Sequence, residues 1–491
     1  MKRKLLDTSN LTIKHLSKLI ASREISCLEV VDAIIERIEK LNPKLNAFIT
    51  ILDESARREA MHADSLIKQG RYLGPLHGIP ISLKDLIYIN GIRSTSGSKI
   101  LADFVPDYDS TVAIKLRTAG AVIVGTNNLH EFASGITGIN PHYGSSKNPW
   151  DYARMSGGSS GGSAVAVSSG MSLASIGTDT SGSIRVPSSL CGIFGLKPTY
   201  GRVSKHGVMP LAPSIDHVGP LARSVWDIAA LLQVIAGYDK LDMSSKKAPV
   251  PDYLKEISSS EGKDSGSSSN NNIETSDEKF KIGIPKQFFF DMIEPKVMEI
   301  FREFVDRLHG CGITTSNFDL DGTDKIFETW RPIRLAEAAA IHNDWMVSRL
   351  QDYGEDVIRM LEKGLEITAV RYINALHKWR QVIKGAFLKG MSEYDALLVP
   401  TTIIPAPLLN QNEVNIEGKS TEVYLSLSRL TSVFNIIDLP VLNIPAGLVG
   451  SKLPVGVQLV GRPFDEARIL KIAYAYEQHN NLAEQFIPAI V

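Results

Sequence analysis

The sequence predicts an α/β fold, because short apolar runs with the character of buried strands alternate with segments of helical period. The runs lie at 77–86, 121–125 and 172–177, and such alternation is typical of a sheet covered by helical layers. The chain has 491 residues, of which 43% are apolar and 22% charged, as in ordinary globular enzymes. This length supports a large core and by itself predicts about two to four domains.

The first long helix is predicted near the amino-terminal end. Ser26 and Glu29 have the spacing of a capping box, in which each side chain accepts a hydrogen bond from the other residue's backbone N–H. Apolar residues follow at helical spacing from Leu28 to Leu41. We expect the helix to end at Asn42-Pro43, because proline and the residue before it disfavour helical continuation.

A different composition appears at about 256–279. Residues 258–277 contain one apolar residue among twenty and are rich in serine and asparagine. Such a segment cannot bury enough apolar surface to offset the entropy lost on ordering. We therefore expect a disordered surface insertion within one fold rather than a linker between domains.

Composition also limits the partners and the compartment. The 53 Lys and Arg residues balance 54 Asp and Glu residues, so no overall field favours direct binding of nucleic acid or anionic lipid. No apolar run reaches the roughly 18 residues of a membrane-spanning helix, so we expect no contact with a membrane. Cys27, Cys191 and Cys311 are too few and too scattered for a disulfide framework or a zinc site. These features favour a cytoplasmic protein.

Two Gly/Ser-rich segments stand out: GGSSGGS at 157–163 and GTDTSGSIRVP at 177–187. A flexible linker is disfavoured, because apolar residues flank both segments closely. A phosphate loop would need Lys followed by Ser or Thr where the chain has Ser183 and Ile184. The nucleophile elbow of an α/β-hydrolase matches around Ser159, but the residues before it make a poor strand and no histidine stands in a telling context.

A fourth interpretation joins these serines to a lysine. Lys84 lies in the apolar run GIPISLKDL at 78–86, after a bend marked by proline. A lysine in such a place is usually a surface charge whose stem lies along a strand. If Lys84 is buried, however, desolvation disfavours its protonated form, and a neutral amine is a competent general base. Lys84 is therefore a candidate base for the serines.

Together, three segments resemble the amidase signature family. They are GPLHGIPISLKDL at 74–86, the stretch at 148–167 that contains SGGSSGGSAVAV, and GTDTSGSIRVPSSLCGIFGLKPTYGRVS at 177–204. The resemblance extends from Ile13 to the carboxyl-terminal end of the chain, and its specific core lies between residues 74 and 200.

The resemblance implies one large α/β/α domain over residues 1–491, around a mixed and twisted sheet, in place of the several domains that length predicts. It also implies a Ser–Ser–Lys triad. Ser183 would be the nucleophile, Ser159 the bridging serine beside a cis peptide, and Lys84 the general base. An acyl-enzyme on Ser183 would then be hydrolysed by water, with no metal or cofactor.

The resemblance assigns further roles around the triad. The backbone N–H groups of Thr180, Ser181, Gly182 and Ser183 are expected to form the oxyanion hole. The supporting residues are expected to be Gly158, Ser160, Asp179 and Arg185. The family usually has glycine at the position of Ser181, and a side chain there excludes conformations open only to glycine. We expect this variant to be tolerated.

Two functional classes share this signature: free-standing amidases, and the A subunit of the glutamine-dependent amidotransferase that corrects mischarged tRNA. The A subunits use an acidic residue, shortly before a late Leu-Pro pair, for the ammonium group of glutamine. The corresponding stretch at 425–430 contains no acid, and Ser428 stands at this place. Arg380 does match the arginine that such subunits use for the glutamine carboxylate, so it is a candidate residue of the substrate pocket.

Residues 128–144 look more like the free-standing amidases. We therefore expect a free-standing amidase that hydrolyses a small-molecule amide to the acid and ammonia or an amine; the alternative is the A subunit of the amidotransferase. Partner subunits belong only to the alternative, and a homodimer is left open. Segments such as 288–292, 330–341 and 424–435 are expected to build the pocket, and their apolar content favours an aliphatic or aryl amide.

Overall fold

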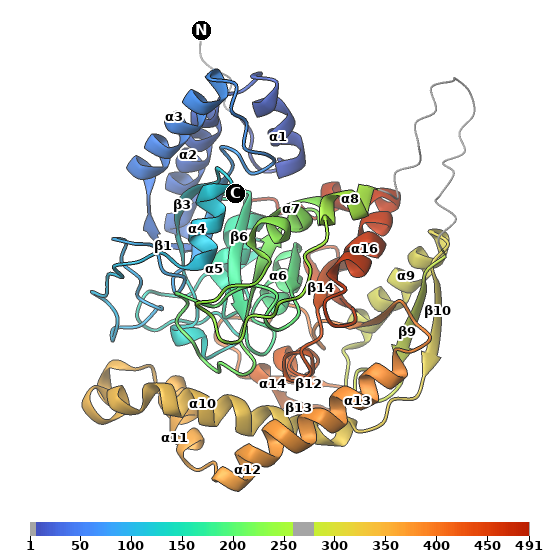
Figure 1. The fold of residues 1–491 in the computed structure, drawn as a ribbon. Helices are drawn as coiled ribbons and strands as arrows, with labels where there is room; N and C mark the ends of the chain where they lie inside the picture. Colours follow the sequence, from blue (N-terminus) through green and yellow to red (C-terminus); the bar gives the residue numbers. More distant parts are fainter. Residues whose placement is uncertain (1–5, 259–278, 491) are drawn as a thin grey trace.

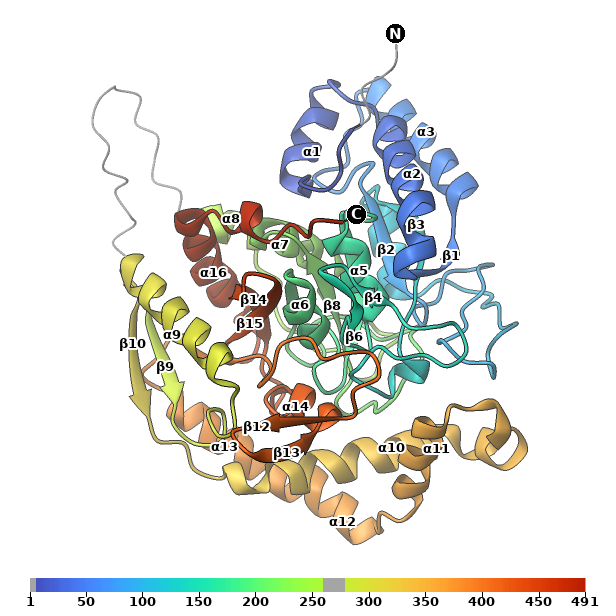
Figure 2. The same cartoon turned by 180° about the vertical axis from the view of Figure 1, so that it is seen from behind.

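The computed structural model describes residues 6–258 and 279–490. One mixed sheet of 11 strands forms the centre of the molecule, with helices on both of its faces (Figures 1 and 2). In spatial order its strands are β1 (Phe48–Ile51), β3 (Val122–Asn127), β2 (Pro80–Lys84), β6 (Ala174–Asp179), β8 (His217–Ala222), β7 (Phe194–Lys197), β14 (Val441–Val449), β15 (Leu453–Val460), β11 (Ala396–Pro400), β9 (Lys281–Pro285) and β10 (Thr314–Phe318). This is the single α/β domain that the resemblance implies, and the several domains that length predicts are not found.

The direction of the strands determines where polar side chains gather. β2 runs parallel to β3 and to β6, with Leu83 beside Ile176. Beyond β6 the neighbours pair antiparallel as far as β11, and β9 then runs parallel to both β10 and β11. Because β2 and β6 end at the same edge of the sheet, their last residues, Lys84 and Asp179, lie at one edge. Sites of α/β proteins commonly form at such carboxyl ends.

Helices pack around this sheet in three groups. Figures 1 and 2 place α1 to α3 at one end of the molecule and α10 to α13 at the opposite end, beside the hairpin of β12 and β13. Against the sheet itself pack α3, α5, α6, α7, α9 and α16. The helices are α1 (Ile13–Ala21), α2 (Cys27–Leu45), α3 (Asp53–Lys68), α4 (Thr111–Thr118), α5 (Gly161–Ser168), α6 (Arg185–Cys191), α7 (Val225–Ile235), α8 (Tyr253–Ser258), α9 (Pro295–Gly310), α10 (Ile326–Ser348), α11 (Glu355–Leu365), α12 (Ala369–Ile373), α13 (Arg380–Gly390), α14 (Val423–Ser428), α15 (Val433–Ile436), α16 (Glu466–Asn480) and α17 (Leu482–Gln485). The small hairpins are β4 (Lys147–Asn148) with β5 (Asp151–Met155), and β12 (Glu413–Ile416) with β13 (Lys419–Glu422).

The capping box predicted at the start of α2 is present. Ser26 Oγ accepts a hydrogen bond from Glu29 N–H at 3.1 Å, and Glu29 Oε2 accepts one from Ser26 N–H at 3.0 Å. The predicted end at Asn42-Pro43 is wrong, because α2 continues through Pro43 to Leu45. The helix ends at Asn46 instead, whose φ of 53° is left-handed, a conformation that asparagine tolerates well.

The three apolar runs of the sequence contain buried strands, as predicted. They correspond to β2, β3 and β6, and every residue of these strands is buried. Most of the insertion expected at about 256–279 lies outside the described residues; its first residues, 256–258, belong to α8. Among the described residues, none of the helices combines the length and apolar character needed to cross a bilayer.

Candidate active site

Lys84 is the last residue of β2 and is fully buried. Its Nζ donates hydrogen bonds to Ser159 Oγ at 2.6 Å and to Thr178 Oγ1 at 2.8 Å. Ser159 precedes α5, and Thr178 belongs to the neighbouring strand β6. The structure therefore brings the predicted lysine into direct contact with the predicted bridging serine, although 75 positions separate them in the chain.

The surroundings of Lys84 favour a neutral amine. Burial lowers the pKa of Lys84 from its usual value to about 7, and this effect exceeds the opposing attraction of Asp179 and Asp216. An ordinary lysine has a pKa near 10.4 and is almost fully protonated at neutral pH. A substantial fraction of Lys84 is thus available at neutral pH as a proton acceptor.

The backbone around Ser159 is held by contacts on both sides. The peptide bond between Gly158 and Ser159 is cis, as the resemblance implies. His130 N–H donates to Ser159 O at 3.1 Å. Gly158 packs so closely that a Cβ there would lie 2.6 Å from Gly138 N. Any larger residue at position 158 would therefore displace the backbone beside Ser159.

Ser160 links this segment to the nucleophile segment. Its Oγ donates to Thr178 O at 3.1 Å, and its N–H donates to Ser183 O at 3.2 Å. Ser183 itself is almost fully buried, at 3% exposure, and no hydrogen bond to its Oγ is found among the described residues. Catalytic hydrogen bonds often form only when substrate is bound. The segment that contains Ser159 is thus joined to Ser183 through the Ser160 N–H and the Ser183 carbonyl.

Asp179 organises the turn that carries Ser183. It lies at the end of β6, and its carboxylate accepts hydrogen bonds from Gly182 N–H at 2.7 Å and from Ile184 N–H at 3.1 Å. Gly182 has a φ of 119°, which residues with a side chain rarely adopt. Because the Gly182 N–H faces Asp179, the expected oxyanion hole would be formed by the N–H groups of Thr180, Ser181 and Ser183.

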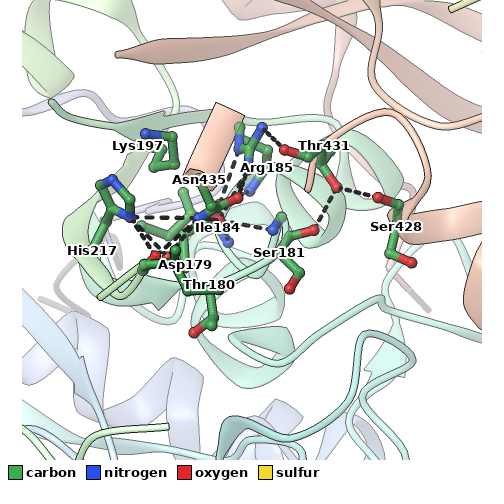
Figure 3. A network of polar contacts seen from close by, with 12 residues as sticks. Asp179, Thr180, Ser181, Ile184, Arg185, Lys197, His217, Ser428, Thr431 and Asn435 are labelled. Carbon is green, nitrogen blue, oxygen red and sulfur yellow. Dashed lines mark hydrogen bonds and ion pairs between the residues drawn. The ribbon is translucent and has the colours of Figure 1, made fainter. Parts of the chain in front are cut away.

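Arg185 completes this arrangement from the first turn of α6. Its guanidinium binds the Asp179 carboxylate through two hydrogen bonds of 3.0 Å, and both side chains are fully buried (Figure 3). It also donates to Asn435 Oδ1 at 2.7 Å and to Gln458 Oε1 at 2.7 Å. Burial alone would raise the pKa of Asp179, but Arg185, Asn435 and Lys197 together outweigh it and hold that pKa well below its usual value. Asp179 is therefore a carboxylate at neutral pH.

Ser181, the departure from the family pattern, is accommodated without left-handed backbone. Its φ is not positive, unlike that of Gly182. Ser181 Oγ accepts a hydrogen bond from Trp330 Nε1–H at 2.8 Å. Ser181 O accepts one from Thr431 Oγ1 at 2.5 Å (Figure 3). A Cβ at position 182, by contrast, would lie 2.3 Å from Thr431 Oγ1. Glycine is thus required at 182 and not at 181.

Two cavities adjoin this turn. One, of about 360 Å³, is lined by Thr178 and Thr180 and by residues of the segment at 208–218, including Asp216 and His217. The other, of about 960 Å³, is lined by Ser134, Gly135, Trp330 and Tyr424 among others. Trp330 and Tyr424 come from two of the three segments expected to build the pocket. The third segment, 288–292, contributes to neither of these two cavities.

Arg380, the predicted pocket residue, lies behind the wall of the smaller cavity. Its guanidinium carbon is 6.0 Å from the ring centre of Tyr200, which lines that cavity. The Arg380 side chain is 12% exposed and forms an ion pair with Asp438. Ser428 is fully buried, and its hydroxyl donates to Tyr424 O at 2.9 Å. No acidic side chain thus stands at the position of Ser428.

Several residues of the site escaped prediction from the sequence. Thr178 lies inside the matched motif, directly before Asp179, and this position could have indicated that it belongs to the site. Asn435 lies in the segment 424–435 that was expected to build the pocket, but its contact with Arg185 was not predicted. This contact and that of Gln458 had no local signal, because the two residues are 250 and 273 positions away from Arg185. Lys197, a second buried lysine whose pKa burial lowers to about 7, was also missed. Among the described residues, no cluster of three His, Cys, Asp or Glu side chains is arranged to hold a metal ion.

Comparison with known proteins identifies the family. The Amidase family model matches residues 29–470. The A subunit of glutamyl-tRNA(Gln) amidotransferase from Geobacter metallireducens is 37% identical over 497 residues, covering 96% of this chain and 98% of that protein. The corresponding protein from Carboxydothermus hydrogenoformans is 37% identical over 492 residues, covering 96% and 97%.

Solved structures agree with this result. A protein described as part of an unexpected vestigial complex, which reveals the origins of an s-triazine catabolic enzyme, has 30% identity and a TM-score of 0.88, covering 96% of this chain and 99% of its own. The A subunit of glutamyl-tRNA(Gln) amidotransferase from Thermotoga maritima has 33% identity and a TM-score of 0.78, covering 96% and 95%. The chain therefore belongs to the amidase signature family and is a hydrolase that acts on amide C–N bonds.

Proposed function

We propose that the chain hydrolyses its amide through an acyl-enzyme on Ser183, with Ser159 as the bridging residue and Lys84 as the general base. The observation that carries this proposal is the 2.6 Å contact between Lys84 Nζ and Ser159 Oγ. It is supported by the burial that lowers the pKa of Lys84 to about 7. A buried lysine in contact with a serine hydroxyl is suited to accept its proton.

In the first step, Ser183 Oγ attacks the amide carbonyl carbon. The Ser183 proton passes to Ser159 while the Ser159 proton passes to neutral Lys84, which becomes an ammonium. The N–H groups of Thr180, Ser181 and Ser183 stabilise the oxyanion, a role in which one lost donor typically costs about 3 kcal/mol. When the C–N bond breaks, the relay returns a proton to the leaving nitrogen. Water then attacks the ester by the same route, which regenerates Ser183 and releases the acid.

For the amide itself, the comparisons support the amidotransferase alternative better than the free-standing amidase that the sequence analysis favoured. The relatives from Geobacter and Carboxydothermus are A subunits that match the chain almost from end to end. By this reading the substrate is glutamine, the product is ammonia, and partner subunits receive the ammonia. Arg380 matches the residue that binds the glutamine carboxylate in such subunits.

A free-standing amidase stays as a second candidate because of one observation. The position at which A subunits carry an acid for the ammonium group holds Ser428, which is fully buried and hydrogen-bonded to Tyr424 O. An ammonium group without a counter-charge is costly to bury. Free glutamine would therefore lack one of its two charged partners, whereas a neutral amide would not need it.

One experiment tests both the chemistry and the choice of substrate. The purified chain is incubated with glutamine and with pentanamide, alone and with the partner subunits of a related amidotransferase, while ammonia release is measured. We expect Ser183→Ala to abolish release from every substrate, and a fluorophosphonate probe to label Ser183 in the unmodified chain. Glutaminase activity that appears only with the partners supports the amidotransferase function, and hydrolysis of pentanamide by the chain alone supports the second candidate. Labelling at Ser159 in place of Ser183 would overturn the mechanism.

A further inference from the structure

Near the smaller cavity, two cationic side chains are paired with a carboxylate of the chain itself. Arg380 and Lys384 lie one turn apart on the same face of α13, and both contact Asp438. Arg380 Nη2 binds Asp438 Oδ1, and Lys384 Nζ donates to Asp438 Oδ2 at 2.9 Å. The side chains of Arg380, Lys384 and Asp438 are 12%, 26% and 17% exposed. Each of the two Asp438 oxygens is thus bound to one cation.

This cluster is close to the smaller cavity. Asp438 lies between α15 and β14, and β14 pairs with β7 so that Val441 lies beside Lys197. Three residues beyond Lys197 is Tyr200, whose ring lies against the Arg380 guanidinium and which also lines the cavity. Tyr200 therefore contacts one cation of the cluster and also forms part of the cavity wall.

We propose that Asp438 is a specificity-determining residue, which occupies Arg380 and Lys384 and so weakens the binding of amides that carry a carboxylate. The inference rests on the proposed amide hydrolysis at Ser183. It does not depend on whether the natural substrate is glutamine or a neutral amide. With Asp438 present, the cluster carries one net positive charge. Without that carboxylate it carries two, and both cations become free to attract an anionic substrate.

The backbone at this position makes Asp438 replaceable. Asp438 has a φ of 64°, in the left-handed region that asparagine adopts as readily as aspartate. Asp438→Asn therefore removes the charge while keeping the shape and the backbone conformation. Asp438→Glu keeps the charge and serves as the conservative variant.

The test compares two ligands that differ only at one end: glutaramate, which carries a carboxylate, and pentanamide, which carries a methyl group. Each is used to protect Ser183 from a fluorophosphonate probe, so that binding is measured whether or not turnover occurs. In Asp438→Asn we expect glutaramate to bind about tenfold more tightly relative to pentanamide than in the unmodified chain. Asp438→Glu should not show this gain, and adding Arg380→Gln to Asp438→Asn should remove most of it.

A matched control is Asp319→Asn, because Asp319 also pairs with a lysine, Lys286, directly after β10, the last strand of the sheet. It should leave the ratio of the two binding constants unchanged. The proposal is overturned if Asp438→Asn is labelled normally at Ser183 and binds the two ligands in the original ratio. Absence of labelling at Ser183 in the unmodified chain would instead remove the proposed function, and the inference with it.

Discussion

At the scale of single residues, burial is what distinguishes Lys84 from an ordinary lysine. Its Nζ contacts two hydroxyl groups, on Ser159 and Thr178, while the charges of Asp179 and Asp216 only partly offset the cost of removing it from water. A lysine in bulk water would be protonated at neutral pH and unable to accept a proton. The same side chain thus becomes a candidate base because of where β2 ends.

This environment predicts the pH dependence of the reaction. Since only neutral Lys84 accepts a proton, kcat/KM should rise with pH through a limb near pH 7 and level off above it. Lys84→Ala should lower kcat/KM by about 10²–10⁴-fold and abolish the limb. The measurement is kcat/KM for a neutral amide as a function of pH, in the unmodified and substituted chains.

Lys197 provides the control, because burial also lowers its pKa to about 7. Lys197 Nζ donates to Pro198 O, and no bond between it and a serine hydroxyl is found in the described part of the chain. Lys197→Met should therefore retain the limb, whatever it does to the maximal rate. Loss of the limb in Lys197→Met, with its retention in Lys84→Ala, would show that Lys197 and not Lys84 is the base.

At the scale of secondary-structure elements, helix α10 is connected to the nucleophile turn by one hydrogen bond. Trp330 Nε1–H donates to Ser181 Oγ at 2.8 Å, and the Trp330 ring is buried. Trp330 also lines the larger cavity. A ligand in this cavity therefore contacts a residue that is bonded directly to the expected oxyanion hole.

We expect this hydrogen bond to position the turn. Trp330→Phe removes the donor and should lower kcat by about three- to tenfold, the range of one net hydrogen bond, with a smaller effect on KM. Ser181→Gly removes the acceptor and restores the usual family residue. In the Ser181→Gly background, Trp330→Phe should cost little more, and a double-mutant cycle of kcat measures this coupling. Equal losses in the two backgrounds would show that Trp330 acts through packing alone.

The elements also show what a sequence reveals locally. β2, β3 and β6 were predicted from apolar runs, and the start of α2 from a two-residue capping pattern, because these signals depend on neighbouring residues. The end of α2 was predicted wrongly. Asn46 closes the helix after Pro43 through its own left-handed backbone and through a hydrogen bond from its N–H to Asn42 O at 2.8 Å. A proline in the last turn is compatible with a helix when a later residue supplies the cap.

At the scale of the whole molecule, contacts between distant segments complete the site. The motif segments place Lys84, Ser159 and Ser183 in one neighbourhood, and the resemblance anticipated this grouping. It did not anticipate that the turn depends on residues beyond 430. Thr431, Asn435 and Gln458 all bind Asp179, Ser181 or Arg185. Contacts between residues so far apart produce no periodic pattern in the sequence. They could therefore not be predicted from the spacing of residues.

Arg185 binds Thr431, Asn435 and Gln458 of the later part of the chain, and we expect its loss to destabilise the entire fold. Arg185→Leu leaves the fully buried carboxylate of Asp179 without its ion-pair partner, which typically costs about 3–5 kcal/mol. Denaturant titrations followed by tryptophan fluorescence and by circular dichroism should show one coincident transition at lower denaturant concentration. The matched control is Arg58→Leu, which removes an exposed ion pair with Glu54 and should change the free energy of unfolding by less than about 1 kcal/mol. If both substitutions had the same small effect, the Asp179–Arg185 pair would not be what stabilises the nucleophile turn.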